Sequence, residues 1–154
     1  MKAKFTALAL AVAGLALSTS VGATSATSTF QVKLTVQSSC QFNSTPISNI
    51  ELGEKPVNTK NVEGTTEVRV QCTKGSVANV KLISTDWKLK DTSGGTISYK
   101  LYGADNQEWN QTNGRAYTNT SSGSEQVFQI KAKVADVGDK SGVFADTVTV
   151  SVDF

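Results

Sequence analysis

Residues 147–154 read Thr-Val-Thr-Val-Ser-Val-Asp-Phe. Apolar and polar residues alternate here without a break, which is the period of a β-strand with one buried and one solvated face. The same alternation recurs along the chain. It is found at 30–37, 67–72, 79–82, 97–102 and 128–134, with a weaker run at 50–52. Turn-rich segments separate these runs, and no stretch after residue 23 keeps the 3.6-residue period of an amphipathic helix.

About seven short strands separated by turns predict a single antiparallel β-sandwich, in which one face of each strand packs inward. The long polar stretch 103–125 is either an elaborated loop or contains an irregular edge strand. We expect Trp87 and Trp109 at the edge of the core rather than in a ligand platform, because large aromatic side chains most often serve as core residues. The sequence shows no repeat, linker or second domain.

The N-terminus has the three parts of a secretory signal peptide. Residues 1–4 are cationic, residues 5–17 are mostly apolar, and residues 18–23 are small and polar. We expect cleavage after Ala23, with Ala26 as the second choice. The apolar run of about 13 residues is shorter than the roughly 20 that span a bilayer, so a retained membrane anchor is the lesser alternative. The sequence therefore predicts an exported chain with no membrane insertion.

Cys40 and Cys72 are the two cysteines of the chain. In an oxidising compartment, a lone pair of cysteines most simply forms one disulfide. A Cys40–Cys72 bridge would stabilise the fold by about 3 to 4 kcal/mol in the chain-entropy model. The alternative, a reactive thiol pair, lacks the close spacing of a redox motif.

Charge and composition exclude several functions. The chain has 15 Lys and Arg against 13 Asp and Glu, and without Lys2 and Lys4 the count is 13 against 13. A neutral exported chain has no basic surface for nucleic acid or anionic lipid. The absence of His removes the commonest general base and metal ligand, and two cysteines cannot complete a zinc site. We therefore predict no catalytic, cofactor-binding or metal-binding residues, no cofactor, and no enzymatic activity.

The two ends of the exported chain are alternating strands. A polar lead, 24–29, precedes the strand at 30–36, and the strand at 147–154 runs to Phe154. Unpaired strand edges are templates for the addition of another strand. The alternative is that the first and last strands pair within the monomer and complete an ordinary sandwich; the pattern alone does not separate the two.

Several motifs together resemble those of the spore coat protein U domain family, which includes the major pilins of archaic, Csu-type chaperone–usher pili. The resemblance covers nearly all of the exported chain and rests on the run 30–40 that ends at Cys40, on 50–53, on Val70 to Cys72, on 99–102, and on the Gly142–Phe154 ending with its Asp146-Thr147 pair. One departure is Leu52-Gly53, where the family more often has an aromatic residue before the glycine.

The resemblance implies an incomplete immunoglobulin-like sandwich that lacks its last strand and is completed by a donor strand from a neighbouring subunit. It divides the chain into a signal peptide (1–23), an N-terminal donor-strand extension (24–37) and a pilin sandwich domain (38–154). The implied donor residues are Phe30, Val32, Leu34 and Val36. The implied acceptor groove is lined by Val148, Val150, Val152 and Phe154.

The leading hypothesis is therefore a structural pilin that polymerises by donor-strand exchange into a surface pilus used for adhesion and biofilm formation. Its implied partners are a periplasmic pilus chaperone, an outer-membrane usher and neighbouring copies of the same pilin. The route is export through the periplasm to an extracellular fimbrium. The alternative is a self-complete secreted β-sandwich binding module, or a spore- or surface-coat protein. A secreted enzyme ranks third.

Overall fold

A computed structural model describes residues 25–43 and 46–154 of the chain, so the predicted signal peptide (1–23) lies outside the described residues. The fold is all-β, apart from one 3-10 turn, η1 (Asn119–Ser121). The strands are β1 (Cys40–Phe42), β2 (Lys60–Cys72), β3 (Asn79–Ile83), β4 (Lys88–Lys90), β5 (Thr96–Ser98), β6 (Lys100–Gly103), β7 (Arg115–Ala116), β8 (Gln126–Asp136) and β9 (Thr149–Asp153). Within the described ranges, no helix has the length and apolar character needed to cross a membrane.

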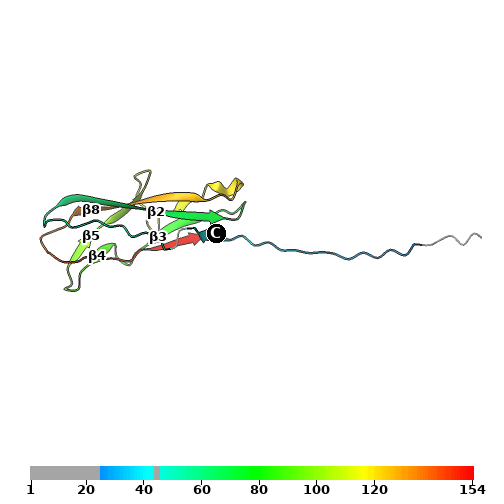
Figure 1. The fold of residues 1–154 in the computed structure, drawn as a ribbon, viewed down its shortest axis with the longest axis horizontal. Coiled ribbons are helices and arrows are strands. Elements are labelled where there is room, and N and C mark those ends of the chain that lie inside the picture. The colour runs from blue at the N-terminus through cyan, green and yellow to red at the C-terminus, as the bar shows by residue number, and fades with distance from the viewer. Residues whose placement is uncertain (1–24, 44–45) are drawn as a thin grey trace, which may run out of the picture. The chain divides into compact units, whose positions relative to one another are not determined.

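The strands form two main sheets and a ribbon, all antiparallel (Figure 1). The larger sheet has the order β1-β2-β8-β6, and the smaller sheet has the order β7-β3-β9. Strands β4 and β5 form the separate ribbon, which a bridge between Lys90 and Ala145 ties to the chain before β9. The prediction of an antiparallel β-sandwich is confirmed.

The core lies on the inner faces of the two main sheets, where alternate residues of β2, β3, β6 and β8 are buried. Val80 and Leu82 of β3 and Val68 and Val70 of β2 have no exposed surface. Trp109 is 1% exposed and its indole N–H donates a hydrogen bond to the Val80 carbonyl at 2.9 Å. Trp109 is thus a core residue, with its one polar atom satisfied.

The predicted disulfide is present between Cys40 and Cys72. The two residues are Cα partners in the β1–β2 register, which places the covalent link between adjacent strands at the edge of the larger sheet. The bridge closes the loop from 40 to 72.

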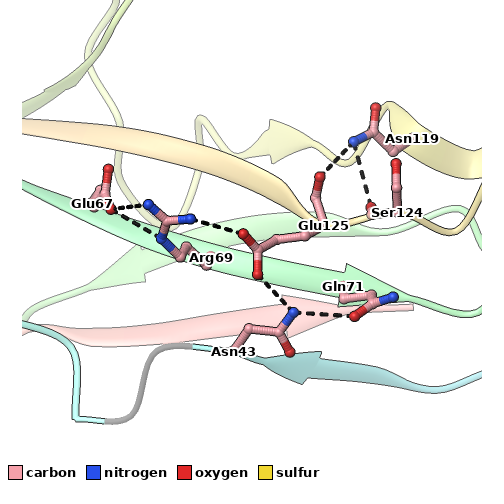
Figure 2. A network of polar contacts seen from close by, with 7 residues as sticks. All are labelled: Asn43, Glu67, Arg69, Gln71, Asn119, Ser124 and Glu125. Carbon is pink, nitrogen blue, oxygen red and sulfur yellow. Dashed lines mark hydrogen bonds and ion pairs between the residues drawn. The ribbon is translucent and has the colours of Figure 1, made fainter.

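The outer face of the larger sheet carries a polar network (Figure 2). Arg69 donates to Glu67 at 3.0 Å and to Glu125 at 2.9 Å, and Asn43 donates to Glu125 at 2.8 Å and to Gln71 at 3.1 Å. These contacts join the chain just after β1 to β2 and to the start of β8. The network therefore fixes the edge of the sheet on its solvated side.

The structure differs from the sequence prediction at several strands. The run 97–102 divides at Tyr99 into β5 and β6, which belong to different sheets. β1 and β4 were not predicted, and the weak run 50–52 forms no strand. The stretch 103–125 contains β7, a two-residue strand at the edge of the smaller sheet, so the edge-strand alternative is the one found.

Residues 25–39 have no regular secondary structure, although 30–37 has the clearest strand pattern near the start of the chain. The described chain divides into a short unit that ends at Thr35 and a larger unit from Val36 to Phe154. A strand pattern alone does not make a strand, because its N–H and C=O groups need a hydrogen-bonded neighbour.

Candidate functional site

A groove of about 940 Å³ opens into the apolar interior of the larger unit. Its floor consists of inward-facing side chains from both sheets, including Leu82 of β3, Leu101 of β6 and Ile130 of β8. Its sides consist of residues 47–55 and 140–146 together with Val148 and Val150. A cleft of this size between the two layers of a sandwich is large enough to accept a chain segment with apolar side chains.

Strand β9 forms one wall of the groove with an open edge. In the described part of the chain, β9 pairs with β3 alone and ends the strand order β7-β3-β9. Val150 and Val152 face the buried Leu82 and Val80 across this pairing, so the apolar face of β9 points to the core. The second edge of β9 offers free backbone N–H and C=O groups to another strand.

The opposite wall is the segment 47–55, which the two prolines of the chain, Pro46 and Pro56, bracket. Its apolar side chains Ile47, Ile50 and Leu52 are half-buried against the core. The described backbone hydrogen bonds include none from the N–H groups of this segment. The groove is therefore lined on two sides by backbone with unpaired N–H groups, at the open edge of β9 and along the segment 47–55.

Packing against β2 holds this wall in place. A Cβ atom at Gly64 would lie 2.7 Å from Cγ2 of Ile50 and 3.0 Å from Cδ2 of Leu52, so only glycine lets the wall approach β2 this closely. Two residues further along β2, the Thr66 hydroxyl donates to the Ser48 carbonyl at 2.7 Å. The wall is therefore anchored to β2 through side-chain contacts, while its own N–H groups stay available.

The four predicted acceptor residues occupy different places. Val148 and Val150 line the groove, and Val152 packs against the core beside it. Phe154 is 60% exposed and is not among the residues that line the groove. The structure thus brings the first two into the groove and leaves Phe154 beyond its end.

The predicted donor residues lie in the segment without regular structure. Phe30, Val32 and Leu34 are 86–87% exposed and Val36 is 74% exposed. Four large apolar side chains in one exposed alternating run are unusual for a soluble chain, and such a surface marks an interaction site.

In contrast, segments 47–55 and 140–146, which form most of the groove's sides, were not predicted; Ile50 and Leu52 were the only signal for them.

A hydrogen-bonded cluster around Asp146 fixes the chain just before β9. Oδ2 of Asp146 accepts hydrogen bonds from the Tyr99 hydroxyl at 2.6 Å and the Ser84 hydroxyl at 2.7 Å, and Oδ1 accepts one from the Thr147 N–H at 2.8 Å. Burial alone would raise the pKa of Asp146, but these three donors outweigh it and hold the pKa below its ordinary value. Burial and the bond to Asp146 raise the pKa of Tyr99, so Tyr99 stays a donor.

We expect the Asp146 cluster to make stability depend on pH. A carboxyl whose pKa is lower in the folded state stabilises the fold above its unfolded pKa of about 3.9, and this contribution is lost as the pH falls through the folded pKa. Asp146→Asn should lower the free energy of unfolding by about 1.5 to 3 kcal/mol at pH 7. In urea unfolding, the difference from wild type should shrink below about pH 4.

The matched control is Asp139→Asn. Asp139 lies in the loop before β9, its carboxylate is exposed, and that carboxylate makes no hydrogen bond among the described residues. This variant should unfold like the wild type at every pH. A loss in Asp146→Asn that stays constant down to pH 2 would show that the carboxylate's charge does not stabilise the cluster.

Within residues 25–43 and 46–154, no three side chains from Cys, Asp and Glu lie close enough together to hold a metal ion. The groove is lined by apolar side chains and free backbone groups, together with charged residues such as Glu51 and Lys140. What the arrangement can do is bind an extended chain segment.

The chain is similar to known proteins at the level of a sequence family and of the fold. The chain matches the family model described as the Spore Coat Protein U domain over residues 26–151. A solved structure with a similar fold is the CsuC–CsuE chaperone–tip adhesion subunit pre-assembly complex from the archaic chaperone–usher Csu pili of Acinetobacter baumannii. The TM-score is 0.55 at 19% identity, over 78% of this chain and 41% of that one, so the chain spans about two fifths of that protein's length. No curated protein matches the sequence.

Proposed function

The chain belongs to the spore coat protein U domain family, and we propose that it is a structural subunit of a chaperone–usher pilus. The family match over residues 26–151 and the similarity in fold to a chaperone–tip adhesion subunit complex support this proposal. The subunit is exported through the periplasm and forms part of a fimbrium at the cell surface. It has a structural role there rather than an enzymatic one, and it uses no cofactor.

The groove between β9 and the segment 47–55 is the observation that carries the proposal. It exposes apolar core residues and borders two backbones with free hydrogen-bonding groups, so it fits a missing strand. In the proposed mechanism, donor-strand exchange, the run 30–36 of a neighbouring copy fills the groove. Phe30, Val32, Leu34 and Val36 would pack between the sheets, with Val148 and Val150 along the groove and Val152 and Phe154 at its end.

The energetics suit a stable fibre. Burying four medium or large apolar side chains contributes roughly 1.5 to 3 kcal/mol each, or about 6 to 12 kcal/mol in total. The cost of ordering the donor segment offsets part of this gain. Because each copy donates one segment and accepts another, the contact is head-to-tail and extends into an open filament.

A subunit with an open groove needs a partner before it reaches the fibre. We propose that a periplasmic chaperone first inserts a strand, because an exposed edge beside an apolar cleft is an aggregation site. At an outer-membrane usher, the donor segment of the next copy then replaces the chaperone strand. The homopolymer serves adhesion and biofilm formation in this proposal.

The experiment that tests the proposed function uses the strain that carries this chain. Fibres sheared from its surface should contain this protein and, in SDS without heating, should run as a ladder of multimers that collapses to the monomer on boiling. Loss of the gene should remove the fibres from electron micrographs, and loss of a chaperone should remove the subunit from the periplasm. A stable monomer, expressed alone and with its groove closed by its own N-terminal strand, would instead support a self-complete binding module.

A further inference from the structure

We propose that Lys33 of the donating copy pairs with Glu51 of the accepting copy and that this charge pair sets the register of the inserted strand. The inference rests on the proposed function and adds to it the residues that choose one register among several. Apolar side chains alone would also tolerate a shift of two residues, because such a shift keeps the same face toward the core.

The charge pattern of the donor segment is the first observation. Residues 24–37 contain a single charged residue, Lys33, between the apolar Val32 and Leu34. When these two neighbours point into the groove, alternation turns Lys33 toward the groove's mouth. Lys33 takes part in no ion pair among the described residues, so its charge is available to a partner.

The groove wall has the matching pattern. Glu51 is exposed and lies between Ile50 and Leu52, which are half-buried against the core. Like Lys33, Glu51 has no ion-pair partner within the described ranges. A donor strand laid beside this wall with its apolar side chains inward places its outward Lys beside the outward Glu.

Backbone features limit the wall to a short pairing window. Pro46 and Pro56 have no N–H group to donate, so pairing stops at both prolines. Gly53 has a φ of +70°, in the left-handed region, so a paired strand cannot continue through it. Glu54 therefore lies beyond this point, and Glu51 is the one carboxylate between Pro46 and Gly53.

The described carboxylates near β9 already have partners, since Asp146 accepts hydrogen bonds from Tyr99 and Ser84. The outward positions of β9 are Thr149, Ser151 and Asp153, and the Asp153 carboxylate already pairs with Lys81 at 2.7 Å. A shift of two residues in the register would bring Gln31 or Thr35 beside Glu51 and leave Lys33 without an acid. The charge pair therefore distinguishes one register from its neighbours.

Charge reversal in fibres made from the full-length chain tests the pairing. Lys33→Glu and Glu51→Lys should each speed the release of subunits from fibres in urea at low salt by roughly twofold to tenfold, because each places like charges side by side. The double reversal should return the rate to that of the wild type. In 0.5 M NaCl all three differences should shrink, because the exposed charges are then screened.

Two further variants keep the test decisive. Asp139→Lys, a charge reversal at an exposed residue outside the groove lining, should release subunits at the wild-type rate. If Glu51→Lys prevents assembly, Glu51→Gln removes the pair without bringing like charges together, and its fibres should still release subunits faster than wild type. Equal rates for wild type and both single reversals would overturn the pairing, as would rescue of Lys33→Glu by Glu54→Lys instead of Glu51→Lys. If wild-type fibres did not form at all, the proposed function would fail before this comparison began.

Discussion

A chain that lacks residues 24–36 but keeps its signal peptide should accumulate as a folded subunit and form no fibre. None of the core residues lies in the deleted segment, since the buried cluster runs from Val62 to Val134. The deletion removes all four donor side chains and with them roughly 6 to 12 kcal/mol of burial at each junction. At 1.4 kcal/mol for each factor of ten, even the lower figure weakens the junction by about four orders of magnitude. Electron microscopy and an SDS ladder without heating measure the loss.

The deleted subunit should still accept a strand. When it is produced together with the full-length chain, it should occur once per fibre, at the end where no further strand is donated, and it should shorten the fibres in proportion to its amount. Fibres of normal length from the deleted chain alone would refute the donor role of the segment.

A pair of single substitutions tests the face of the donor strand. Leu34→Asp should abolish fibres as the deletion does, because an unpaired charge would enter an apolar groove. Thr35→Asp introduces the same charge one residue away, on the face that alternation turns to solvent. Fibres with Thr35→Asp should therefore resemble wild type, and equal damage by both variants would contradict the assignment of faces.

The strands that form the core could be predicted from the sequence because their two faces differ. The alternation at 128–134 corresponds to β8, and that at 79–82 corresponds to β3, with Val80 and Leu82 fully buried. The division of the run 97–102 was not predictable in this way. The Tyr99 N–H still donates to the Trp87 carbonyl at 3.1 Å, in line with the β4–β5 register, whereas from Lys100 the chain pairs with β8. Alternation reports which face is buried, and it carries no information on which sheet a strand joins.

The groove was predictable only at one side. The acceptor positions Val148 and Val150 belong to a regular alternating run, whereas the opposite wall has its apolar residues at Ile47, Ile50 and Leu52, a spacing that matches neither strand nor helix. That wall is held by its fit to Gly64 of β2, a contact between distant parts of the chain. A groove left by a missing strand is shaped by contacts between distant parts of the chain, so its full lining could not be predicted from local sequence patterns.

Removing the disulfide should have the second-largest effect. The double variant Cys40→Ala and Cys72→Ala frees a loop with a sequence separation of 32, which should lower the free energy of unfolding by about 3 to 4 kcal/mol. Small domains are stable by only about 5 to 15 kcal/mol, and a sandwich with an open groove lacks the burial of one strand. The fraction of unfolded subunit should therefore rise by roughly two to three orders of magnitude. Urea unfolding of the purified chain measures it, with reduced wild type as the control.

Because of its position, loss of the disulfide should weaken strand acceptance even more than it lowers the stability of the fold. The loop between Cys40 and Cys72 contains the whole groove wall 47–55, which belongs to no sheet. Contacts with Gly64 and Thr66 of β2 hold the wall. Just after it, the Asn58 N–H donates to the Gly138 carbonyl at 2.6 Å. Without the bridge, β1 frays from β2 and the wall loses its fixed start. At a urea concentration where the variant is still folded, it should already bind a donor peptide of residues 26–37 more weakly than wild type. Equal peptide affinity at equal folded fraction would show that Gly64 and Thr66 suffice to hold the wall.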